Sequence, residues 1–141
     1  MNEVFIRERR LKNATMYYNG SGLIKIVLDD NIELDVADIK EQRSVVADFT
    51  SGKSHVILAI TGSNTSATKE AREYSSSTAT LGRVAEAIVI SSLAVRLMGN
   101  IYIHFHKPGV ITKMFESEQK ALEWLREQMA GSIASSNSIK S

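Results

Sequence analysis

A cluster of hydroxyl and amide side chains is the strongest candidate for chemistry in this 141-residue chain. Thr61, Ser63, Asn64 and Ser66 directly follow the apolar run 56–60. In open α/β sheets, ligands gather where a strand ends and a helix begins, and free N–H groups there favour an anion, including a phosphate esterified to Ser63 or Ser66. The alternative is a solvent loop whose hydroxyls only cap the next helix. We treat these four residues as a candidate binding or regulatory loop.

A metal site is the second chemistry to consider. His104 and His106 lie two residues apart, and His55 is distant in sequence. On a helix the first two imidazoles would point about 200° apart, and no acidic ligand is spaced usefully nearby. The chain has no Cys, which excludes disulfides and thiolate metal sites. We predict no metal site and no cofactor.

Nucleophilic catalysis would require a base beside a hydroxyl. The sequence suggests one pair, Ser63 as nucleophile and His55 as base. The two residues flank opposite ends of one predicted strand, so the pair is geometrically poor. We therefore predict a protein that is not an enzyme.

The balance of charges gives no reason to expect a partner that is bound through net charge. Lys and Arg number 17 and Asp and Glu 16, a formal net charge of +1, which makes no case for nucleic acid or a membrane surface. The basic run from Arg7 to Lys12 fits a solvated edge. No apolar run approaches the ~20 residues that span a bilayer, and no secretory signal opens the chain, so we expect no integral membrane association and a cytoplasmic protein.

Short apolar runs that alternate with helix-like segments predict an α/β domain. The run Val56–Ile60 does not alternate with polar residues, which indicates an interior strand covered on both faces. We predict a mixed four- to five-stranded sheet opened by a hairpin, with about four helices, in a single domain over 1–130, followed by a disordered tail over 131–141. The predicted strands are 4–6, 14–18, 23–28, 56–60, 84–90 and 111–115, and the predicted helices begin at Asp35, cover 68–77 and 93–105, and follow Ser117.

Apolar side chains recur every four residues from Leu93 to Phe105, which predicts a helix, although the β-prone residues 101–103 leave a strand as the alternative. A helix that is apolar on more than one side is either buried or an interface. We predict that this segment forms a dimer face or lines a small apolar pocket through Leu97, Met98, Ile101, Tyr102 and Phe105.

The order of several short motifs resembles one known family. A hairpin leads into the helix capped by Asp35, and KEAREY (69–74), RLMGN (96–100) and ALEWL (121–125) follow. Together they resemble small bacterial SpoIIAA-like domains, the fold shared by STAS domains and, more distantly, SEC14-type lipid-binding modules. The resemblance implies that fold and no reaction.

In anti-sigma antagonists of this group a phosphorylatable Ser follows the central strand, which corresponds here to the loop 61–66. The acidic residue that usually precedes it has no counterpart in Ala59-Ile60-Thr61-Gly62. We predict a non-catalytic regulatory or protein-binding module whose partner is another protein or a second copy of the chain. The alternative is a small-molecule or lipid carrier, which would need an apolar cavity of roughly 300 Å³ or more.

Overall fold

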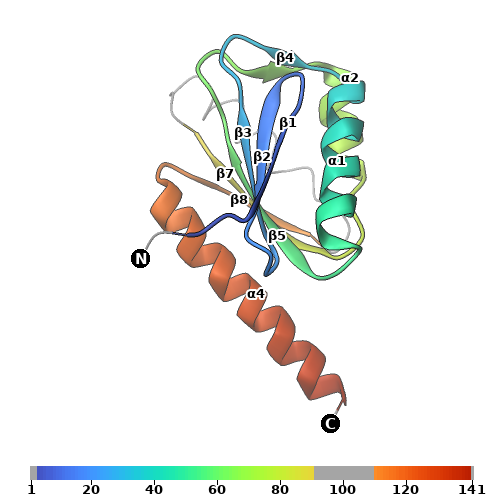
Figure 1. Ribbon diagram of the computed structural model, residues 1–141, viewed down its shortest axis with the longest axis vertical. Coiled ribbons are helices and arrows are strands. Elements are labelled where there is room, and N and C mark those ends of the chain that lie inside the picture. The colour runs from blue at the N-terminus through green and yellow to red at the C-terminus, as the bar shows by residue number, and fades with distance from the viewer. Residues whose placement is uncertain (1–2, 91–109, 141) are drawn as a thin grey trace.

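A mixed six-stranded sheet organises the chain, which is seen in a computed structural model that describes residues 3–90 and 110–140, with side chains to 133 (Figure 1). The strand order is β1-β2-β3-β5-β7-β8. Strands β1 to β3 are antiparallel and β3, β5, β7 and β8 are parallel. The strands are β1 (Arg7–Arg10), β2 (Ala14–Tyr18), β3 (Leu23–Leu28), β5 (His55–Ile60), β7 (Arg83–Val89) and β8 (Ile111–Phe115).

Helices cover both faces of the parallel part of the sheet. Helices α1 (Val36–Thr50) and α2 (Lys69–Ser77) lie on one face and α4 (Glu118–Lys140) lies on the other (Figure 1). Because side chains alternate along a strand, Ile57 points into the core beneath α1 and Leu58 into the core beneath α4. Both are fully buried, which confirms that β5 is an interior strand.

Local side chains fix where the helices begin. The Asp35 carboxylate accepts a hydrogen bond from the Asp38 N–H at 2.8 Å, and the Asp38 carboxylate accepts one from the Asp35 N–H at 3.0 Å. This reciprocal capping box starts α1 at the predicted place. Thr68, rather than Ser66, caps α2 by accepting from the Ala71 N–H at 3.0 Å, and Ser117 accepts from the Lys120 N–H at 3.1 Å in the first turn of α4.

A second, two-stranded sheet lies apart from the main one. Strand β4 (Glu33–Leu34) pairs in parallel with β6 (Ser66–Ala67). The Ser66 N–H donates to the Ile32 carbonyl at 3.0 Å and the Thr68 N–H donates to the Leu34 carbonyl at 2.9 Å. We call this pair the β4–β6 ribbon. It joins the connection from β3 to α1 with the connection from β5 to α2.

The sheet differs from the prediction at its antiparallel edge. It has six strands rather than four or five, and the edge strand is Arg7–Arg10 rather than 4–6. The polar run pairs with β2 because Arg7 and Arg9 extend over the Phe49 ring, with guanidinium carbons 4.7 and 5.4 Å from its centroid, and both pair with the Asp48 carboxylate.

The helices differ from the prediction in number and length. The described residues contain three helices where about four are expected, and the predicted helix 93–105 lies outside them. Helix α4 continues to Lys140 and so includes residues 131–140 of the segment that the sequence predicts as a disordered tail. That segment contains no Pro that would end a helix, and a Cβ added at Gly131 would meet nothing within 4 Å, so the helix passes Gly131 without a steric conflict. Among the described residues, no helix is both long and apolar enough to cross a membrane.

Candidate binding cavity

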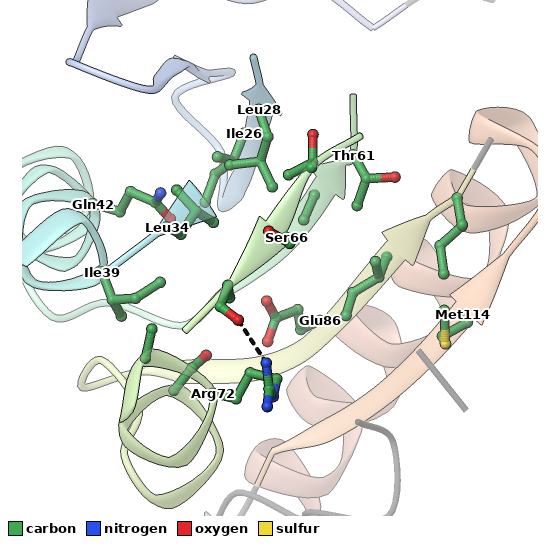
Figure 2. Close-up of a pocket in the computed structure, with 17 residues that line it drawn as sticks. Ile26, Leu28, Leu34, Ile39, Gln42, Thr61, Ser66, Arg72, Glu86 and Met114 are labelled. Carbon is green, nitrogen blue, oxygen red and sulfur yellow. Dashed lines mark hydrogen bonds between the residues drawn. The ribbon is translucent and has the colours of Figure 1, made fainter. Parts of the chain in front are cut away.

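A cavity of about 190 Å³ opens between the sheet, α1 and α2, beneath the β4–β6 ribbon (Figure 2). Its apolar wall comes from several elements. Ile26 and Leu28 lie two residues apart on one face of β3, and Ile88 lies on the same face of the sheet in β7. Leu34 from the ribbon and Ile39 from α1 close the opposite side. The cavity is therefore mostly apolar and lies where parallel strands end.

Two charged side chains line this apolar cavity. Glu86 lies in the middle of β7 with only 8% of its surface exposed. Arg72 extends from α2, and its Nη1 donates to the Ala67 carbonyl of the ribbon at 2.6 Å. Figure 2 shows the carboxylate and the guanidinium on the same side of the cavity, away from Ile26 and Leu28. Buried charges are rare in cores, so an acidic residue on the interior strand indicates a polar task for this site.

A break in the strand register places a buried partner beside Glu86. The pairing of β5 with β7 shifts between His55 and Val56, which face Arg83 and Ala85. The extra residue brings Arg83 near Glu86, with Nη1 3.9 Å from Oε2. That distance is an ion pair, so the charge of the buried carboxylate is balanced by a neighbour on its own strand.

His55 lies next to this buried pair and is fully inaccessible to solvent. Its Nδ1 lies 2.9 Å from the Lys53 carbonyl, which fixes that nitrogen as the N–H donor. Its Nε2 has no hydrogen-bond partner among the described residues. Burial lowers the pKa of His55, and the positive charge of Arg83 lowers it further. Burial thus favours the neutral imidazole of His55 at the start of β5, whereas Ser63 follows the other end of that strand.

The predicted polar loop divides into a cavity part and an exposed part. Thr61 and Ser66 line the cavity, and the Thr61 hydroxyl donates to the Val89 carbonyl at 3.0 Å. Ser63 and Asn64 are exposed at the tip of the loop. The Ser63 N–H donates to Asp30 Oδ1 at 2.8 Å, which ties the tip to the turn after β3.

The loop does not lead directly into a helix, contrary to the prediction. Strand β6 lies between the loop and α2, because Ser66 and Ala67 pair with β4. Helix α2 begins only at Lys69 and is capped by Thr68. Ser63 therefore lies away from the helix N-terminus at which the sequence predicts an anion site.

Several predicted residues cannot be compared with this cavity. The predicted interface or pocket residues Leu97, Met98, Ile101, Tyr102 and Phe105, and the pair His104 and His106, lie outside the described residues. Within the described residues, no group of three or more His, Asp or Glu side chains could hold a metal ion. Glu86 interrupts the apolar pattern of the predicted strand 84–90. This was the one signal in the sequence for the charged side chains that line the cavity.

Comparisons with known proteins give a family and no described function. Residues 16–129 match a family model described as a domain of unknown function, DUF7793. No curated protein and no solved structure matches the chain. The matched region includes every residue of the cavity named above.

Proposed function

Because the chain belongs to the DUF7793 family, whose description assigns no activity, we propose a function from its cavity. The protein is a non-catalytic binding module that holds one small, largely apolar molecule between the sheet and helices α1 and α2. The observation that carries this proposal is an apolar cavity at the carboxyl ends of parallel strands, lined by a few convergent polar groups.

The volume of the cavity limits the ligand. A dry apolar cavity of about 150 Å³ holds a benzene-sized molecule. The present cavity, at about 190 Å³, suits a ligand slightly larger than that, and it is below the roughly 300 Å³ expected for a drug-sized or lipid ligand. A small metabolite fits this space better than a lipid chain does.

The resemblance to SpoIIAA-like domains supports a regulatory role for such binding. The exposed tip of the 61–66 loop offers a surface for a protein partner, and hydrogen bonds to the turn after β3 hold it in place. The Asn31 N–H donates to the Ser63 carbonyl at 2.8 Å, and the Thr65 hydroxyl donates to the Asp29 carbonyl at 2.9 Å. The same loop contributes Thr61 and Ser66 to the cavity, so a ligand in the cavity would contact the loop whose tip would bind the partner. Protein docking at the tip is thus the second candidate function.

Phosphorylation of Ser63 would weaken the contact between the tip of the 61–66 loop and the turn after β3. Its N–H already donates to the Asp30 carboxylate, so an added phosphate would bring two anions together and separate the two turns. Ser63→Asp should therefore weaken the contact between the turns, which faster hydrogen exchange at the amides of Asn31 and Ser63 would report.

Calorimetric titration with toluene and isopentanol tests the proposed cavity binding. We expect one molecule of probe to bind per chain. Ala59→Leu adds a branched side chain to the cavity wall and should weaken binding by tenfold or more, whereas Ala47→Leu adds the same atoms to an exposed position of α1 and should leave binding unchanged. Circular dichroism verifies that both variants are folded. A wild-type protein that binds neither probe would refute the proposal.

A further inference from the structure

We infer that the ligand is a small aliphatic carboxylate, an anion whose charged head binds Arg72 and whose branched apolar body fills the cavity. This inference rests on the proposed binding function and names the chemistry of its ligand. The observation that carries it concerns the two charged side chains that line the cavity. Glu86 is already paired within the chain, whereas the guanidinium of Arg72 pairs with no carboxylate among the described residues.

The Glu86 carboxylate does not provide a binding site for a cation. It is buried in the middle of β7, with Arg83 Nη1 3.9 Å from its Oε2, and its side chain makes a further interaction within the chain. A ligand ammonium beside it would lose its hydration and would find a carboxylate whose charge is already balanced. The acidic side chain of the cavity therefore does not select a positively charged ligand.

The Arg72 guanidinium retains donors for an anion. Arg72 lies near the start of α2 and is exposed, on the side of the cavity away from Ile26 and Leu28 (Figure 2). Its Nη1 donates to the Ala67 carbonyl at 2.6 Å, which holds the guanidinium against the β4–β6 ribbon and uses one of its five N–H groups. A carboxylate would thus meet a planar cation that is already held in place, which is the partner that binds carboxylates most specifically.

The other polar groups of the lining select no charge. The hydroxyls of Thr61 and Thr65 each donate to a backbone carbonyl within the protein. Gln42 and Ser66 also line the cavity, and both side chains are neutral. Within the described lining, Arg72 is therefore the group that favours a charged ligand, and the charge that it favours is negative.

The positions of these groups give the ligand one orientation. Its apolar body would contact Ile26 and Leu28 on β3, where burial of apolar surface is favourable. Its carboxylate would stay at Arg72, and because that side chain is exposed, the carboxylate would keep part of its hydration. A carboxylate with an isopentyl body is slightly larger than benzene, which suits the cavity volume of about 190 Å³.

Three probes with the same isopentyl body test this inference on the wild-type protein by calorimetric titration. Isocaproate carries a carboxylate, isopentanol a neutral hydroxyl and isopentylamine an ammonium group. We expect isocaproate to bind at least tenfold more tightly than the other two, since it alone forms a charge-assisted hydrogen bond with Arg72. Isopentanol or isopentylamine binding as tightly as isocaproate would overturn the carboxylate while leaving the cavity proposal intact. Failure of all three, and of toluene, would overturn both.

Substitution of Arg72 assigns the carboxylate to its partner. Arg72→Gln should weaken isocaproate by about tenfold and should leave isopentanol unchanged. Arg72→Lys keeps the charge but loses the planar fork, so its loss for isocaproate should be smaller than that of Arg72→Gln. Arg126→Gln is the matched control, because it removes an exposed arginine from α4 on the opposite face of the sheet, and it should affect neither probe.

Circular dichroism verifies that the three variants are folded. Equal losses for isocaproate and isopentanol in Arg72→Gln would indicate a structural effect of the substitution and would overturn the assignment of the carboxylate to Arg72. An Arg72→Gln protein that binds isocaproate as tightly as the wild type does would overturn it as well.

Discussion

Replacement of Gly62 by alanine tests the contact that holds the β4–β6 ribbon over the cavity. A Cβ at Gly62 would lie 2.5 Å from Asp30 Oδ1 and 2.7 Å from the Asp29 carbonyl oxygen, where ordinary contacts begin at 3.4 Å. The Asp30 side chain can rotate away, but the Asp29 backbone must move. Overpacking of this kind costs about 1–3 kcal/mol, and the lower entropy of the unfolded alanine chain offsets about 0.4–1 kcal/mol.

We therefore expect Gly62→Ala to lower the free energy of unfolding by about 1–2 kcal/mol and the Tm by roughly 3–7 °C. Urea unfolding followed by circular dichroism measures the first quantity and calorimetry the second. Gly131→Ala is the matched control, because its Cβ would meet nothing within 4 Å on an exposed part of α4. That change should stabilise the protein by about 0.5–1 kcal/mol, through helix propensity.

Probe binding to the cavity provides a second measurement on the Gly62→Ala variant. Separation of the turns should displace Leu34 and Ser66, which line the cavity, so probe binding should weaken together with stability. Gly131→Ala should leave probe binding unchanged. A Gly62→Ala protein with wild-type stability and wild-type probe affinity would mean that the loop 61–66 does not contact the turn after β3. The described placement of the β4–β6 ribbon over the cavity would then be wrong.

Two further predictions concern β5. Ile57→Ala and Leu58→Ala should each lower the free energy of unfolding by about 3 kcal/mol in urea titrations, because both faces of the strand are buried, whereas a strand covered on one face would tolerate one of the two changes. Burial lowers the pKa of His55 from its ordinary value of 6.5, so the unfolded chain binds the proton more readily; stability should be full above about pH 6.5 and fall as the pH drops through the lower pKa of the folded state. His55→Phe should flatten that part of the profile between about pH 8 and pH 5, and an unchanged slope would show that another group causes it.

Individual strands and helix ends were predictable where a local residue pattern favours one structure. The unbroken apolar run 56–60 suits a strand covered on both faces, and Asp35 could satisfy the first turn of a helix with its own carboxylate. The basic edge strand β1 was missed because its stability comes from Arg7 and Arg9 packing on Phe49, a contact that spans about forty residues of sequence and leaves no local periodicity.

The cavity was less predictable than the sheet. The sequence identified Thr61 and Ser66, because polar residues after a buried strand are a local signal. The β4–β6 ribbon has two residues per strand, too few to show alternation, so the sequence did not indicate that Ser66 lies in a strand above the cavity. The pairing of Arg83 with Glu86 depends on a register shift, and the approach of Arg72 depends on how α2 packs; both arise only from tertiary structure.

The ribbon covers part of the cavity and is the least firmly held part of its lining. Its strands belong to two different crossover connections, the one from β3 to α1 and the one from β5 to α2. The ribbon has only two residues in each strand and is joined by backbone hydrogen bonds that include those from Ser66 and Thr68, whereas β5 is paired along both of its edges. The ribbon can thus detach while the sheet stays folded, as a local opening of low free energy. Native-state hydrogen exchange at Ser66 and Thr68 would measure that opening directly.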